Sequence, residues 1–262
     1  MSVDPSAQVD PSAQLHPTAI VGAHSQVGPG CRLDAYAVVG PHTTLGPACH
    51  VFSFATIGGP AQDRRTPPDA PYRLVCGAQN LFREGCTVSR GTGHGTGETR
   101  LGDGNLLMAH SHVGHDCQLG HGNTLANGVS LAGHVIVGDG VSLGGHAAVH
   151  QFARLGDLAF IAANAMVSQD IPPYCLAAGD RARLLGLNHV GLERAGLAPE
   201  ARVALEAAFR ALLRRPGGRR DVEAFLASPM PEVGRLARFL ADTTRGVARV
   251  GPTTRKGDAN DR

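Results

Sequence analysis

Aliphatic residues recur at every sixth position through the first two-thirds of the chain. One unbroken series runs over residues 3–57, a second runs over residues 101–167, and a shorter one over residues 76–88 keeps the step in a different phase. A small residue, most often alanine, stands two positions before most of these aliphatic residues. A period of six fits neither the 3.6-residue period of an amphipathic helix nor the simple alternation of a strand.

This period predicts a parallel β-helix. Each hexapeptide forms one short strand and one turn, three hexapeptides make a triangular coil, and the coils stack about 4.8 Å apart. The large aliphatic side chain fills the interior and the small one fits where the interior narrows. Glycine often follows the aliphatic residue, where a tight turn leaves little room for a Cβ. The repeats add up to about eight coils.

The repeat is interrupted twice and then ends. The interruptions predict loops near 59–75 and 89–100, and insertions into a solenoid usually lie on its functional face. We expect a hexapeptide-repeat domain, a C-terminal α-helical domain and a disordered tail, at residues 1–175, 176–250 and 251–262. The fold class is therefore mainly β, with a helical C-terminal part.

The composition agrees with a narrow interior. The chain has 35 glycines, 4% aromatic residues and no tryptophan, and its 42% hydrophobic content excludes a disordered chain. No apolar run approaches the roughly 20 residues that a membrane span requires. The first residues, MSVDPSAQVD, lack the basic and apolar regions of a signal peptide, so we expect a cytoplasmic protein. The six cysteines are then expected to be small buried hydrophobic residues.

Charge is distributed unevenly along the chain. Residues 1–180 carry 8 basic against 13 acidic residues, whereas residues 181–262 carry 16 against 9. Apolar spacing behind Pro199 predicts a helix over residues 199–213 in this basic part, with two shorter helices after it. A basic surface favours an acidic protein or a phosphorylated ligand. Nucleic acid is not an expected partner, because basic runs interleaved with aromatic residues are missing.

The candidate chemistry lies in a cluster of outward-facing histidines. His134 follows His115 by one coil and one further residue, so the two project from the same face of neighbouring coils. A neutral imidazole that a carboxylate holds in one tautomer can act as a general base, and a backbone N–H can stabilise an oxyanion. His115, Asp116 and the Gly133 amide supply these three functions.

A metal centre is the alternative chemistry for this cluster. His110 and His115 have plausible ligand spacing, and a catalytic zinc needs about three protein ligands. Hexapeptide-fold carbonic anhydrases take a third histidine from a preceding coil, but the stretch 76–91 contains none. We therefore expect no metal. A third hypothesis, a non-catalytic solenoid, predicts that the histidines have no chemical role.

Several strings resemble one family of enzymes. NLLMAHSHVGHDC, LAGHV, AVHQF, QDIPPY and TTRGV are similar to the acyl-ACP–UDP-N-acetylglucosamine O-acyltransferases, where ACP is acyl carrier protein. The resemblance extends from the first coil to about residue 250, and HVGHDC together with AVHQF is its most specific part. It implies a left-handed β-helix that assembles as a homotrimer with active sites between subunits. The reaction that it implies is the first step of lipid A synthesis.

The resemblance also implies roles for individual residues. His115, oriented by Asp116, would deprotonate the glucosamine 3-hydroxyl of UDP-N-acetylglucosamine, while the Gly133 N–H steadies the oxyanion. The hydroxyacyl donor would be carried on the phosphopantetheine of acyl carrier protein, with no bound cofactor. Ala163 replaces a glycine of some members and implies a slightly shorter acyl chain. The expected substrate-binding residues are Gln62, Asp63, Arg65, His112, His134, His150, Gln151, Asn188 and Arg194.

Three positions depart from the family pattern. Val190 stands where the family often has an acidic residue, Glu193 where it has a basic one and Ala195 where it has a second arginine. Losing a cation beside a diphosphate costs about 1–3 kcal/mol of charge-assisted bonding. A related enzyme that acts on a different or amino-substituted nucleotide sugar, including an N-acyltransferase, therefore stays open.

Overall fold

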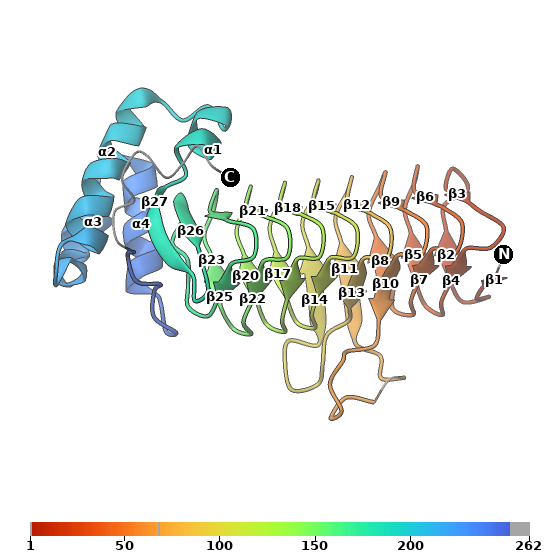
Figure 1. Ribbon diagram of the computed structural model, residues 1–262. Helices are drawn as coiled ribbons and strands as arrows, with labels where there is room; N and C mark the ends of the chain where they lie inside the picture. Colours follow the sequence, from red (N-terminus) through yellow and green to blue (C-terminus); the bar gives the residue numbers. More distant parts are fainter. Residues whose placement is uncertain (1, 68, 252–262) are drawn as a thin grey trace.

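The structure is a computed structural model that describes residues 2–67 and 69–251 (Figure 1). The chain winds into a long triangular prism whose three faces are parallel β-sheets, with helices at its C-terminal end. Strands that are neighbours in a sheet lie one coil apart, which in an uninterrupted coil means three hexapeptides, as in the pairing of Val113 with Leu131. The predicted parallel β-helix is confirmed.

The three sheets are called A, B and C here, and up to β25 each takes every third strand. Sheet A contains β1 (Ser2–Val3), β4 (Ile20–Val21), β7 (Val38–Val39), β10 (Thr56–Gly59), β13 (Thr87–Ser89), β16 (His112–Val113), β19 (Ser130–Leu131), β22 (Ala148–Val149) and β25 (Met166–Val167). Sheet B contains β2 (Gln8–Val9), β5 (Gln26–Val27), β8 (Thr43–Leu45), β11 (Arg73–Cys76), β14 (Glu98–Leu101), β17 (Gln118–Leu119), β20 (Ile136–Val137) and β23 (Arg154–Leu155). Sheet C contains β3 (Gln14–Leu15), β6 (Arg32–Leu33), β9 (His50–Val51), β12 (Leu81–Phe82), β15 (Leu106–Leu107), β18 (Thr124–Leu125), β21 (Ser142–Leu143), β24 (Phe160–Ile161), β26 (Cys175–Ala178) and β27 (Arg183–Leu187).

The core is a column of the repeating aliphatic and small residues. Leu107, Leu125 and Ala147 are fully buried, as the hexapeptide register predicts. The six cysteines are free and buried in the same column. Because each coil contributes only a few side chains to the interior, the core is narrow, and every functional group must lie on a face or at a corner of the prism.

The three corners of the prism carry different chemistry. Corner AB, where the chain passes from sheet A to sheet B, carries the histidines of interest and two long loops, residues 60–72 and 90–97, which leave it on the same side (Figure 1). These loops lie where the sequence predicts insertions. Corner BC carries a buried asparagine ladder, in which Asn105 donates to Asn80 and accepts from the amide of Asn123.

The prism ends in a strand pair and a helical segment. Strands β26 and β27 pair antiparallel, so residues 176–187 of the predicted helical domain are mostly strand; alternating burial along β26 explains this difference. Helix α2 (Pro199–Phe209) continues into the π-helical turn η1 (Arg210–Arg214), in place of the single helix predicted over residues 199–213. The helical elements are α1 (His189–Arg194), α2 (Pro199–Phe209), η1 (Arg210–Arg214), η2 (Gly218–Asp221), α3 (Glu223–Leu226) and α4 (Pro231–Ala241).

Residues 252–262, nearly all of the tail that we expected to be disordered, lie outside the described residues. Within the described residues, no helix combines the length and the apolar character that crossing a membrane demands.

Candidate functional site

His115 and Asp116 form a hydrogen-bonded pair at corner AB, in the turn after β16. The Nδ1 atom of His115 lies 2.8 Å from Oδ2 of Asp116. The Asp116 side chain is fully buried and the His115 side chain is 15% exposed, so only the imidazole can reach a substrate. This arrangement fixes the His115 tautomer with its proton on Nδ1 and leaves Nε2 free to accept a proton.

The loop of residues 90–97 encloses the Asp116 carboxylate. Thr92 donates from its amide and, at 2.6 Å, from its hydroxyl, and Thr96 and the Gly97 amide donate to Oδ1. Burial opposes ionisation, but the hydrogen bonds from Thr92 and His115 hold the pKa of Asp116 below its ordinary value. Asp116 is therefore an ionised, rigid anchor for His115.

His134 occupies the same corner one coil further on. Its ring centroid lies 4.9 Å from that of His115 in an edge-to-face arrangement, and Phe152 stacks on it at 4.5 Å. Burial lowers the pKa of His134 and the nearby His115 lowers it further, although Asp116 opposes this. The prediction that His115 and His134 project together from neighbouring coils is borne out by this geometry.

Gly133 lies directly against the imidazole of His115. A Cβ at this position would be 2.6 Å from Cε1 and 2.7 Å from Nε2 of His115, so the backbone can approach the ring only because the residue is glycine. In the part of the chain that the structure describes, the Gly133 N–H donates to no protein acceptor. An unpaired backbone donor beside the free Nε2 is the arrangement that an oxyanion site requires.

The loop of residues 60–72 brings Asp63 and Arg65 to the same corner. Arg65 donates to both oxygens of Asp63, and its guanidinium group is the main reason why the pKa of Asp63 is below its ordinary value. His94, from the other loop, lies 3.0 Å from Asp63 through Nε2. Gln62 is exposed beside them. Both loops thus contribute to the site that contains His115.

The same residues could in principle offer ligands to a metal ion. His115, Asp116 and His134 each present one ligand atom within 4.8 Å of the others. However, Oδ2 of Asp116 already accepts hydrogen bonds from Thr92 and His115, and the Nδ1–H of His115 points at Asp116 rather than at an open position. The arrangement of His115 and Asp116 therefore fits a hydrogen-bonded pair better than a metal site.

His150 and His112 flank the His115 site on sheet A. His150 lines a groove of about 320 Å³ that extends along sheet A from Ser130 and Ala132. Its Nδ1 lies 2.8 Å from a guanidinium nitrogen of Arg245, whereas Gln151 beside it is exposed. His112 contacts Thr87 at 2.8 Å, and burial lowers the pKa of its half-buried ring.

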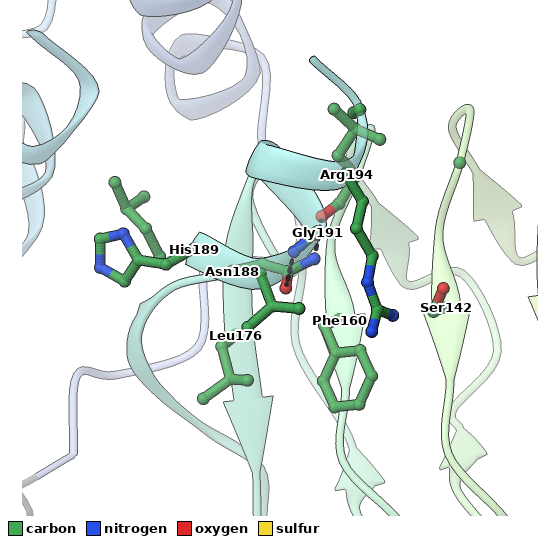
Figure 2. A pocket seen from close by; sticks show the side chains of 12 residues that line it. Ser142, Phe160, Leu176, Asn188, His189, Gly191 and Arg194 are labelled. Atoms are coloured by element: carbon green, nitrogen blue, oxygen red, sulfur yellow. Dashed lines mark hydrogen bonds between the residues drawn. The ribbon is translucent and has the colours of Figure 1, made fainter. Parts of the chain in front are cut away.

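Asn188 and Arg194 lie in a different place, on a pocket of about 640 Å³ beside sheet C (Figure 2). Asn188 caps helix α1 by accepting from the Gly191 amide, and Arg194 extends from α1 alongside Phe160 toward Ser142. The departures Val190 and Ala195 line this pocket with apolar side chains. Glu193 is not among the residues that line it.

The predicted site residues therefore form three groups in one chain. His115, Asp116, Gly133, His134 and the loop residues meet at corner AB, and His150 lies at the same corner two coils beyond His115. Asn188 and Arg194 lie beside sheet C and corner BC. Ala163, the predicted acyl-length residue, is in the turn that leads from sheet C to sheet A, the third corner. A single chain does not bring these three groups together.

Sequence reasoning missed four residues that matter here. Thr92 holds Asp116, His94 contacts Asp63, Phe152 stacks on His134 and Arg245 contacts His150. The hexapeptide register could have placed Phe152 at corner AB, because it follows β22 as His134 follows β19. Thr92 and His94 lie in an irregular loop, where no periodic signal indicates which side chains point inward.

Comparisons with known proteins give a consistent result. A family model described as "Udp N-acetylglucosamine O-acyltransferase; Domain 2" matches residues 170–248. An acyl-ACP–UDP-N-acetylglucosamine O-acyltransferase from Anaeromyxobacter sp. (strain K) is 42% identical over 191 residues, 70% of this chain and 74% of the relative.

Solved structures with the same kind of name are similar throughout. A UDP-N-acetylglucosamine acyltransferase from Francisella novicida has a TM-score of 0.85 at 28% identity, covering 94% of each chain. The Arabidopsis enzyme has a TM-score of 0.83 at 30% identity, covering 95% of this chain and all of the other.

The fold and the named relatives define an acyltransferase built on a left-handed parallel β-helix, as predicted. Within this class, the chain belongs to the acyl-ACP–UDP-N-acetylglucosamine O-acyltransferase family.

Proposed function

We propose that this chain transfers a 3-hydroxyacyl group from acyl carrier protein to the 3-hydroxyl of UDP-N-acetylglucosamine, the first step of lipid A synthesis. The observation that carries this proposal is the His115–Asp116 pair with Gly133 against its free nitrogen. The substrates are inferred from the family to which the chain belongs, and the general-base chemistry is inferred from the His115–Asp116 pair.

The first step is proton transfer to His115. Its Nε2 takes the proton of the sugar 3-hydroxyl while the hydroxyl oxygen attacks the thioester carbonyl carbon. Asp116 holds the proton on Nδ1 and stabilises the imidazolium that forms, and its own low pKa keeps it ionised throughout. The positive charge on His115 therefore develops beside a fixed buried anion.

The second step is collapse of the tetrahedral intermediate. The carbonyl oxygen carries the negative charge and accepts a hydrogen bond from the Gly133 N–H. The C–S bond then breaks, and the thiol of the phosphopantetheine arm leaves with the proton held by His115. The products are the acylated sugar nucleotide and free carrier protein, and the cycle requires no bound cofactor.

Substrate binding is assigned by position. Asp63 and Arg65 with Gln62 lie next to His115 and would bind the sugar, together with His112 and His134. His150 lines the groove on sheet A, and Gln151 follows it in the chain, so the pair is assigned to the acyl donor. Asn188 and Arg194 would bind the nucleoside diphosphate in the pocket of Figure 2, where the single arginine, without a second at Ala195, suits weaker phosphate binding.

A homotrimer would bring the separated groups together. Among the described residues, the strands of sheet A carry no charged side chain, whereas sheet B includes Arg73, Glu98, Arg100 and Arg154. Ile20 and Met166 of sheet A are 44% and 45% exposed in the single chain. An uncharged face with exposed apolar residues favours a protein contact. We therefore infer that sheet A lies at a subunit interface, which light scattering of the purified protein can test.

The cytoplasm is the proposed compartment, because six free buried cysteines are typical of a reducing environment. The acidic carrier protein is expected to approach the arginine-rich helical segment. Several of those arginines have intramolecular partners, however, as Arg215 has in Asp221 and Arg210 in Glu206.

The test is mass spectrometry of products formed from UDP-N-acetylglucosamine and a panel of hydroxyacyl carrier proteins. One acyl group should be added at the 3-oxygen, and His115→Ala should lower kcat by about 10²–10⁴-fold without loss of fold. A product acylated on nitrogen, or on a different sugar nucleotide, would favour the related enzyme left open by Val190, Glu193 and Ala195. Stoichiometric zinc whose removal abolishes activity would favour the carbonic anhydrase hypothesis instead.

A further inference from the structure

His94 lies within the site but has no role in the mechanism above. It projects from the loop of residues 90–97, and its ring centroid is 6.1 Å from that of His115 and 6.4 Å from that of His134. The three imidazoles therefore lie close together at corner AB. The His94 side chain is 33% exposed, so a ligand can reach it.

One nitrogen of His94 is already engaged. Nε2 lies 3.0 Å from Oδ2 of Asp63 and 3.1 Å from Nη2 of Arg65. Arg65 can only donate, so Nε2 either accepts from Arg65 or donates to Asp63. Nη2 of Arg65 already donates to Oδ2 of Asp63 at 2.7 Å, and a lone pair on Nε2 would face that carboxylate oxygen, so the favourable arrangement is an Nε2–H that donates to Asp63. The neutral ring then carries an acceptor lone pair on Nδ1, for which the described residues provide no donor.

Each oxygen of the Asp63 carboxylate already accepts at least two hydrogen bonds within the protein. Oδ1 accepts from the amide and the Nε of Arg65, and Oδ2 accepts from Nε and Nη2 of Arg65 and from His94. Of the His94 and Asp63 acceptors, Nδ1 of His94 is the one that accepts from no described residue. A ligand that carries two hydroxyl groups would find an acceptor for one on Nδ1 of His94 and an acceptor for the other on Nε2 of His115.

We propose that His94 is a binding residue for the acceptor sugar: its Nδ1 accepts a hydrogen bond from a sugar hydroxyl other than the one that His115 deprotonates. This inference rests on the proposed function, because it assigns the hydroxyl-bearing ligand to the acceptor. Asp63 fixes the tautomer of His94 as Asp116 fixes that of His115, so the site contains two histidine–carboxylate pairs with different tasks.

Two variants separate the two nitrogens of His94. A glutamine places its amide nitrogen where Nε2 lies, so His94→Gln keeps the donor to Asp63 and loses the acceptor. An asparagine places its amide oxygen where Nδ1 lies, so His94→Asn keeps the acceptor and loses the contact with Asp63. His121→Gln, at an exposed histidine of corner BC that bonds the Asp103 amide, is the matched control.

Steady-state kinetics with both substrates is the experiment. His94→Gln should raise KM for UDP-N-acetylglucosamine roughly tenfold, the effect of one lost hydrogen bond, with kcat and the KM of the acyl donor nearly unchanged. His94→Asn should keep KM within about threefold of the wild type. All variants should unfold at the wild-type temperature.

The reverse order would overturn the proposal. If His94→Gln behaves as the wild type and His94→Asn is impaired, His94 only holds the two loops together. A fall in kcat at unchanged KM would place His94 in the proton transfer instead. Calorimetric titration of the wild type with UDP-N-acetylglucosamine alone separates this failure from that of the proposed function. A wild type that neither binds nor acylates this sugar nucleotide refutes the proposed function. An active wild type together with an unaffected His94→Gln variant refutes only the role of His94.

Discussion

Replacing Gly133 with alanine tests the position of the proposed base. The new Cβ would lie 2.6 Å from Cε1 and 2.7 Å from Nε2 of His115. Nonbonded carbon atoms make contact at about 3.5–4.0 Å, so the imidazole must move by roughly 1 Å. A displacement of this size costs about 10²-fold in rate, which corresponds to about 2.7 kcal/mol in the activation barrier.

The fold should tolerate this substitution, because the clash is with a side chain and Gly133 does not have a positive φ. Gly145→Ala is the matched control: it also precedes a histidine in a turn, but its Cβ would meet nothing nearer than the Asn127 carbonyl oxygen at 3.5 Å. Initial rates with hydroxyacyl carrier protein and thermal unfolding of both variants provide the measurements. A Gly133→Ala enzyme with a kcat within about threefold of the wild type would refute the assignment of His115 as the base.

Three further predictions concern stability and specificity. Asn105→Ala removes the donor to Asn80 and the acceptor for the Asn123 amide, so the free energy of unfolding should fall by about 3 kcal/mol, while exposed Asn127→Ala should leave it unchanged. The pKa of Asp116 is lowered in the folded state. The contribution of Asp116 to stability is therefore present above the ordinary carboxyl pKa and is lost as the pH falls through the pKa of the folded state. Asp116→Asn should consequently flatten the fall in melting temperature below about pH 4. Ala163→Gly should shift the preferred acyl chain to a greater length in a mixed donor assay, and unchanged preference would exclude Ala163 from the acyl groove.

The regular part of the molecule could be predicted from the sequence because the six-residue period determines which residues form each strand and which face of the prism that strand occupies. His134 follows His115 by one coil and a single further residue, and their ring centroids lie 4.9 Å apart. The two loops could not be predicted in this way. Asp63 and His94 belong to no repeat, and their contact depends on how two irregular segments pack against each other at corner AB.

The hexapeptide register also indicates how the chain must assemble, which the types of side chain alone do not indicate. Val113 and Val149, which precede His115 and His150, are separated by six hexapeptides, so the chain returns to the same corner after two whole coils. Val113 and Ile161, which precede His115 and Ala163, are separated by eight hexapeptides, which is not a whole number of coils. His115 and Ala163 must therefore lie at different corners of one prism, as the structure shows. A substrate that contacts both requires a second chain, and this geometric requirement supports the proposed trimer independently of the uncharged face of sheet A.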